Sequence, residues 1–231
     1  MRMLKHVMQS FACAAVALTS CDLAFADVQT ILGRKMKVED PLPGVNPSKR
    51  VVTVSGYERF TPNTIVGNPI IGGATIQVAV TGVTSTRQTF TLPAGPPPQS
   101  TGPGWTGKNV PGRGAKFLYV DKNGEASPVT KLVLLSTIGR RFALKARIEA
   151  QGNNAPVDIV PGNPTGELGI AVTIGDGDSY CVLFGGMAGG DVIDKDPGKV
   201  VVAARPIGEG CPQGVVVGSG CGNGAVDSDA E

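Results

Sequence analysis

Histidine is almost absent from this sequence: the single one, His6, lies in an N-terminal segment expected to be removed on export. A mature chain without imidazole has no side chain whose ordinary pKa lies between 5 and 8. Ser-His-Asp and Cys-His nucleophiles are thereby excluded, and so are zinc sites built on histidine. Aromatic residues are also scarce, at 5% of the chain, which leaves little material for stacking subsites in a sugar cleft. We therefore expect no enzyme.

An excess of charge of either sign is also missing. Without the N-terminal segment the chain has 19 basic and 18 acidic residues, a net charge of +1. That balance offers no argument for nucleic acid or anionic membranes as partners. No apolar run is long enough to span a bilayer, so we expect no transmembrane segment.

The N-terminus has the pattern of a secretory signal peptide. Arg2 and Lys5 precede a short apolar run, and Ala24 and Ala26 form an A-x-A site before Asp27. The sequence therefore predicts a signal peptide over residues 1–26 and a secreted, periplasmic or cell-surface protein. An alternative is a lipobox at residues 18–21, "LTSC", which would leave the protein lipid-anchored at Cys21.

Apolar and polar residues alternate with a period of two through most of the mature chain. In residues 141–149, Phe142, Leu144, Ala146 and Ile148 alternate with mainly polar residues, as in a strand buried on one face. No segment has the period of an amphipathic helix. The sequence predicts an all-β fold, an antiparallel β-sandwich or barrel-like structure. The expected strands cover residues 33–40, 50–56, 73–81, 86–93, 115–121, 129–137, 141–149, 168–175, 179–185 and 199–205.

Two segments with the same order of features indicate an internal duplication of a β-meander unit. They begin at Gly67 and Gly162, and each has an Asn-Pro turn, an alternating strand and a following strand. The Gly/Pro-rich connection between the halves either links two sandwiches or crosses over within one, and the modest core of each half favours the crossover. The expected parts are a first β unit (27–94), the connection (95–114), a second β unit (115–212) and a flexible tail (213–231).

Residues 102–109, "GPGWTGKN", have the spacing of a phosphate-binding loop without its context. Asn109 stands where a hydroxyl would hold magnesium, and the following "VPGRG" cannot begin the required helix. Because glycines and prolines crowd this region, we expect it to lack regular structure. Trp105, the only tryptophan, is expected in the core and not on a ligand platform.

Five aspartates within 21 residues are weak candidates for a metal site. The first two fit the start of a calcium loop, but Tyr180 occupies the third ligand position. "GDG" and "DPG" are typical of turns, so we expect a hairpin at residues 173–186 and turn aspartates throughout. Calcium binding and a glycosidase carboxylate pair remain as alternatives. The five residues are Asp176, Asp178, Asp191, Asp194 and Asp196.

The mature chain has three cysteines, Cys181, Cys211 and Cys221. In an oxidising compartment Cys181 and Cys211 are expected to pair, which stabilises the fold by roughly 3–4 kcal/mol in the chain-entropy model. A Cys181–Cys221 bond, with Cys211 unpaired, is the alternative.

Two resemblances point to an extracellular protein. Residues 221–231, "CGNGAVDSDAE", resemble the start of the myxobacterial-type cysteine-rich repeat. The resemblance implies a disulfide-bonded appendage without catalytic residues; because the copy is truncated, Cys221 is expected to be unpaired or mispaired. Residues 32–212, with "GRKMKVED", "GATIQV", "GW" ahead of "KFLYVDKNG" and "YCVLFGG", resemble uncharacterised secreted β-rich proteins of environmental bacteria. That resemblance implies export and a β fold, and brings no activity.

These observations predict a secreted, non-catalytic β-rich structural or interaction protein. Its partner is expected to be an extracellular protein or a glycan, with no nucleic acid and no cofactor. The alternative is a carbohydrate- or calcium-binding extracellular module, and a more remote alternative is a glycoside hydrolase.

Overall fold

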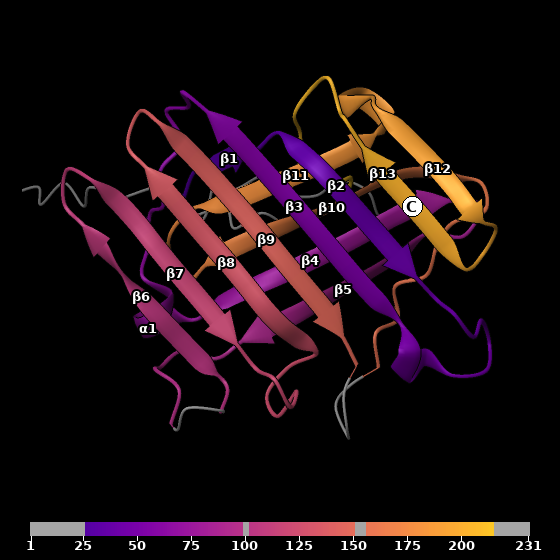
Figure 1. Ribbon diagram of the computed structural model, residues 1–231, viewed down its shortest axis with the longest axis horizontal. Coiled ribbons are helices and arrows are strands. Elements are labelled where there is room, and N and C mark those ends of the chain that lie inside the picture. Colours follow the sequence, from indigo (N-terminus) through magenta and orange to yellow (C-terminus); the bar gives the residue numbers. More distant parts are fainter. Residues whose placement is uncertain (1–25, 99–101, 151–155, 215–231) are drawn as a thin grey trace, which may run out of the picture.

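Two β-sheets packed face to face make up the part of the protein that the computed structural model describes, residues 26–98, 102–150 and 156–214. The larger sheet has the strand order β12-β13-β2-β3-β9-β8-β7-β6, and the smaller has the order β1-β11-β10-β4-β5. Figure 1 shows the larger sheet in front, with the strands of the smaller sheet crossing behind it. All strand pairs are antiparallel except β1 with β11.

The elements follow one another along the chain with three short helical turns among the strands. The strands are β1 (Val28–Thr30), β2 (Gly33–Glu39), β3 (Val51–Arg59), β4 (Ala74–Gly82), β5 (Thr86–Leu92), β6 (Gly104–Val110), β7 (Gly114–Val120), β8 (Val129–Thr137), β9 (Arg141–Glu149), β10 (Thr165–Ile174), β11 (Ser179–Gly185), β12 (Asp191–Asp196) and β13 (Val200–Ala204). The helical turns are η1 (Pro47–Lys49), α1 (Pro69–Gly72) and η2 (Gly186–Ala188).

The predicted all-β sandwich is confirmed, and it is one sandwich. β3 pairs with β9 in the larger sheet, and β4 pairs with β10 in the smaller one. Strands of the predicted first unit (27–94) and second unit (115–212) therefore lie side by side in both sheets. In each half, two hairpin strands in the larger sheet are followed by two in the smaller, β2-β3-β4-β5 and β8-β9-β10-β11.

The core lies between the sheets and consists of the inward-facing residues that the alternation marked. Phe142 of β9 and Tyr180 of β11, both fully buried, stack across the sheet interface with ring centroids 5.2 Å apart. The Tyr180 hydroxyl accepts a hydrogen bond from the Val66 N–H at 2.7 Å, so its polar end is satisfied at the core edge. Burial raises the pKa of the Tyr180 phenol well above its ordinary value. Tyr180 therefore stays neutral in the core.

The predicted hairpin at residues 173–186 and the Cys181–Cys211 disulfide are both present. β10 and β11 pair in register from Thr173 opposite Ser179 to Glu167 opposite Gly185. The disulfide ties β11 to the chain that follows β13. The segment after β13 covers the outer side of β10 and β11. Its Pro212 packs so closely on Gly169 of β10 that a Cβ on this glycine would lie 2.7 Å from the proline ring. The two strands are consequently buried on both faces.

Two expectations about local structure were wrong. Within the supposed irregular connection, residues 104–110 form β6, which pairs with β7 along its whole length. Gly107 has a φ of +137°, and a Cβ there would lie 2.1 Å from the Lys116 carbonyl, so the glycine permits the strand. Trp105 of this strand is fully buried, as predicted, and its indole N–H donates to the Pro93 carbonyl at 3.0 Å. The second error concerns three of the expected turn aspartates: Asp191 and Asp194 lie within β12, and Asp196 is its last residue.

Candidate functional site: a basic sheet face

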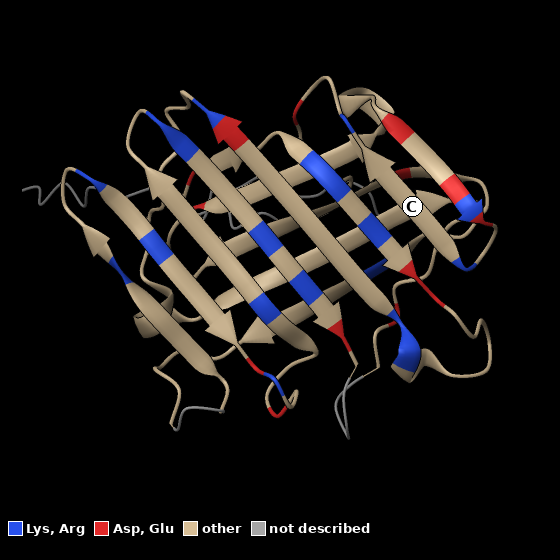
Figure 2. Cartoon of the chain, viewed as in Figure 1, with Lys and Arg blue, Asp and Glu red and all other residues tan. Residues whose placement is uncertain are grey.

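Many lysine and arginine residues lie on the outer face of the larger sheet, over six adjacent strands. Because side chains alternate along a strand, the residues between the core positions of β2, β3 and β6 to β9 point to this outer face. Arg34, at the β-bulge between Gly33 and Lys35, joins them because it lies over the ring of outward-facing Tyr57. Figure 2 shows the blue bands of lysine and arginine running across the outer face. The face, called the basic face below, carries Arg34, Lys35, Lys37, Arg59, Lys108, Lys116, Lys131, Arg141, Lys145 and Arg147.

Strand register places these cations close to one another. Lys131 of β8 lies opposite Arg147 of β9, and Lys108 of β6 lies opposite Lys116 of β7. Directly opposed residues in antiparallel strands have Cβ atoms about 4.5–5.5 Å apart, so like charges there repel one another. Repulsion of this kind destabilises a sheet unless an anion lies over it. The arrangement therefore resembles a binding surface more than a stabilising one.

Only two acidic residues share the basic face, and both lie at one edge of it. Glu39 forms an ion pair with Lys37, and Glu149 with Arg147. The other eight cations form no ion pair with any residue that the structure describes. Ten cations against two carboxylates leave an excess of eight positive charges, whereas the whole chain carries +2. The near-balanced net charge, which gives no argument for nucleic acid or anionic membranes, therefore does not report how strongly the charges are segregated on this face.

A shallow depression of about 490 Å³ lies in the middle of the basic face. Val133, Leu135 and Ala143 contribute its apolar surface, and cations surround them. This volume falls within the range of small-ligand sites. Its charged rim consists of Lys116, Lys131, Arg141, Lys145 and Arg147. The depression can therefore hold an anionic group that also has an apolar side.

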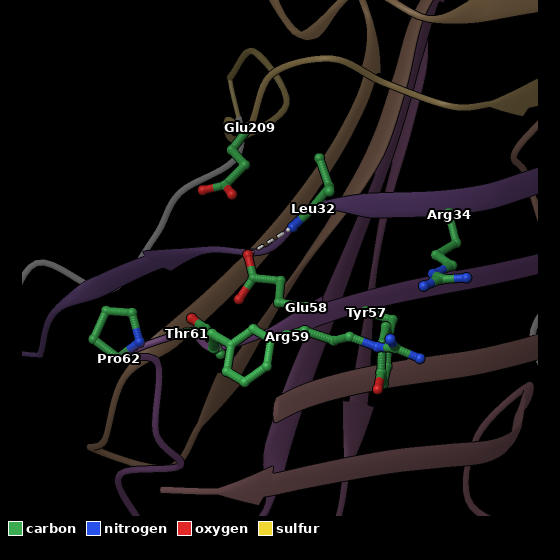
Figure 3. A pocket seen from close by; sticks show the side chains of 9 residues that line it. Leu32, Arg34, Tyr57, Glu58, Arg59, Thr61, Pro62 and Glu209 are labelled. Atoms are coloured by element: carbon green, nitrogen blue, oxygen red, sulfur yellow. Dashed lines mark hydrogen bonds between the residues drawn. The ribbon is translucent and has the colours of Figure 1, made fainter. Parts of the chain in front are cut away.

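Tyr57 is the outward-facing aromatic residue beside this depression, and its ring is already occupied. The Arg34 guanidinium lies over the Tyr57 ring, 4.7 Å from the centroid, in a cation–π contact. Tyr57 also lines a second pocket, of about 470 Å³, at the end of the sandwich (Figure 3). No other aromatic residue lies among the outward-facing positions of β2, β3 and β6 to β9. The six strands of the basic face thus offer charge and apolar surface, and the open ring nearest to Tyr57 is that of Phe60, 86% exposed, directly after β3.

The second pocket contains two neighbouring carboxyl groups, those of Glu58 and Glu209. Glu58 is 8% exposed and accepts hydrogen bonds from the Leu32 N–H at 2.9 Å and the Asn63 amide at 2.8 Å, the first of which Figure 3 shows. Glu209 accepts a hydrogen bond from the Thr30 hydroxyl at 2.9 Å. Burial raises the pKa of Glu209, and the negative charge of Glu58 raises it further, against the opposing effect of Thr30. The pKa of Glu209 therefore lies above the ordinary value of a glutamate.

Glu209→Gln should remove a pH-dependent loss of stability. Because the folded-state pKa of Glu209 lies above its unfolded value, its contribution is fully present below about pH 4 and is lost as pH rises through the folded pKa. A glutamine is neutral throughout, so the variant should match the natural protein at pH 4 and melt at a higher temperature at pH 7. Thermal melts between pH 4 and 7 check this. A variant that is less stable by the same amount at every pH would contradict it.

The five candidate aspartates do not converge on one point. Asp176 is exposed in the β10–β11 turn, whereas Asp178, two residues later, is buried and accepts hydrogen bonds from Asp27 and Gln29. Each of the three later aspartates has a different partner. Asp191 forms an ion pair with Arg205, Asp194 accepts hydrogen bonds from Thr165, and Asp196 forms an ion pair with Lys199. In the described ranges no three His, Cys, Asp or Glu side chains are grouped so that they could hold a metal ion.

Other sequence predictions fall outside this surface. Cys21, the lipidation candidate, and Cys221, with the repeat-like segment 221–231, lie outside the described residues. Of the predicted cleavage site, Ala26 and Asp27 are the first two residues described. The basic face itself was missed. Its signal was present, because Lys35, Lys37, Lys116, Lys131, Lys145 and Arg147 all occupy the polar positions of predicted strands.

Comparison with known proteins found no family model, no curated protein and no solved structure that matches this chain. The fold and the site therefore define its class by themselves: an all-β, two-sheet sandwich with one basic outer face. The Cys181–Cys211 disulfide fits an oxidising compartment. None of the helices in the described residues has the length and apolar character that a membrane crossing requires.

Proposed function

We propose that this protein is a secreted, non-catalytic binding protein that holds an acidic polysaccharide on its basic face. The observation that carries the proposal is a set of eight cations on one sheet face, around an apolar depression, that form no ion pair with the described part of the chain. Cations that repel one another gain most from a ligand with repeating negative charge, which releases its counterions on binding. Export after Ala26 and a duplicated β unit belong to the same proposal.

A polysaccharide suits the basic face better than a nucleic acid. Proteins that bind single-stranded nucleic acids on a sheet usually stack bases on exposed aromatic rings. Here Tyr57 is covered by Arg34, and the exposed ring beside it, Phe60, follows the end of β3 and is a single ring, not a row of rings along the face. A sugar ring needs only an apolar surface of its own size, which Val133, Leu135 and Ala143 provide, and its carboxylate or sulfate groups find lysine and arginine around it.

Salt dependence tests the proposal directly. Binding of the natural protein to polygalacturonate, measured by biolayer interferometry from 20 to 300 mM NaCl, should give a log–log slope of about −3 or steeper. Such a slope corresponds to at least four cations that displace counterions. Single-stranded DNA of equal charge should bind more weakly at each salt concentration. Absence of binding at 20 mM NaCl, or an affinity indifferent to salt, would contradict the polyanion; stronger binding to DNA would contradict the polysaccharide.

A further inference from the structure

The carboxyl group of Asp178 is buried without a cation beside it. The residue is 5% exposed and immediately precedes β11. Its oxygens accept hydrogen bonds from two neutral donors, the backbone N–H of Asp27 at 3.0 Å and the side-chain amide of Gln29. No lysine or arginine in the described ranges forms an ion pair with it. A carboxylate removed from water is costly unless charge or hydrogen bonds compensate for it; each oxygen of Asp178 has one neutral donor, and a cation at either position would compensate the charge more strongly.

The backbone nitrogen beside this carboxylate belongs to Asp27, which would become the first residue if the chain were cut after Ala26. The sequence places an A-x-A site at Ala24 and Ala26, directly before it. Asp27 is held in place from its other side as well, because its carbonyl accepts the Ser179 N–H at 2.9 Å. β1 begins at the next residue, with Val28 opposite Ser179. The Asp27 nitrogen is therefore fixed next to Asp178 by the edge of the smaller sheet.

We propose that cleavage after Ala26 turns the Asp27 nitrogen into an α-ammonium group that forms an ion pair with Asp178. The inference rests on the export part of the proposed function. An endopeptidase of the export machinery adds water across the Ala26–Asp27 peptide bond. Ala26 keeps the new carboxylate, and the freed amine of Asp27 is protonated at neutral pH. A neutral N–H donor thus becomes a cation at the same position, and charge-assisted hydrogen bonds are roughly twice as strong as neutral ones. Processing consequently fastens β1 to β11.

The test compares two full-length genes expressed in an exporting bacterium. One is natural, and the other has Gly-Ser inserted between Ala26 and Asp27, so that the same A-x-A site precedes the cut. In the second product the ammonium group lies two residues, up to about 7 Å, from the Asp27 nitrogen. Each gene is made with Asp178 and with Asp178→Asn, and intact mass establishes the first residue of every product. Gln29→Ala serves as the matched control, because it removes a neutral partner of Asp178 and leaves the ion pair.

The insertion should lower Tm by about 3 °C or more with Asp178 in place, and by less than about 1 °C with Asp178→Asn. With Gln29→Ala the full effect of the insertion should remain. A second measurement does not require the Asp178→Asn variant to fold. Acylation of the α-amino group at neutral pH should be several-fold slower in the natural product than in the product with the Gly-Ser insertion. A product that keeps its N-terminal segment would overturn export itself. Cleavage after Ala26 with equal Tm values and equal acylation rates, or an equal loss in the Asp178→Asn background, would overturn the ion pair alone.

Discussion

Reversing two charges at the centre of the basic face, Lys131→Glu together with Lys145→Glu, should weaken binding of polygalacturonate at least about 100-fold. Both lysines belong to the rim of the central depression, on the adjacent strands β8 and β9. The double variant lowers the charge excess of the face from eight to four. At about 1 kcal/mol for each cation close to an anionic surface, a change of four charges amounts to roughly 3–4 kcal/mol. Titration at 20 mM NaCl measures the loss.

The same double variant should fold as well as the natural protein or better. Lys131 lies opposite Arg147, and an acidic residue there replaces repulsion with attraction. Thermal melts should give an equal or higher Tm. This combination, weaker binding with undiminished stability, separates a binding residue from a structural one.

The matched control carries the same change of charge outside the basic face. Lys49 lies in η1 and Lys122 in the β7–β8 loop, and both are exposed. When both double variants are compared at 100 mM NaCl, Lys49→Glu with Lys122→Glu should alter binding by no more than about threefold, because salt at that concentration screens charges beyond about 10 Å. Equal weakening by both doubles would assign binding to net charge and not to the face. Unchanged binding in the Lys131 and Lys145 double would remove the face as the site.

The strands were predictable from the sequence because alternation depends on each residue and its immediate neighbours. Residues 141–149 form β9 with the bounds expected, and Phe142, Leu144, Ala146 and Ile148 point into the core. β6 is an edge strand with a partner on one side only, and Gly107 and Asn109 stand at the inward positions where apolar residues would have indicated it. The pattern also fails in β12, where Asp191, Asp194 and Asp196 interrupt the strand.

The candidate site depends on strand order, which alternation does not determine. Lys35 of β2 and Lys145 of β9 are 110 positions apart in the sequence, and both lie opposite Ser55 of the intervening strand β3. Nothing local in either segment indicates that β3 lies between them. A net charge close to zero hides the segregation further, because the acidic residues are distributed over loops, β12 and buried positions such as Glu58 and Asp178. The segregation exists only between the faces of the folded sheet, and not along the chain.

Phe142→Ala should destabilise the fold by about 3–5 kcal/mol, the largest effect on stability that we expect from one substitution. Phe142 is fully buried in β9 and stacks on Tyr180 of the opposite sheet, so its removal leaves a cavity between the sheets. For a chain of this size the loss corresponds to a fall in Tm of roughly 6–20 °C. Phe142→Leu, which keeps part of the volume, should cost about 1–2 kcal/mol. Denaturant unfolding checks both values.

The neighbouring residue provides the contrast that the sandwich requires. Arg141 precedes Phe142 in β9 and points to the opposite side, onto the basic face. Arg141→Ala should change stability by less than about 0.5 kcal/mol while weakening polygalacturonate binding, whereas Phe142→Ala should retain binding at temperatures well below its Tm. If Arg141→Ala were the more destabilising of the two, the assignment of inner and outer faces would be reversed. The expected result is that Phe142 determines stability and Arg141 determines binding, because a strand turns successive side chains to opposite sides of its sheet.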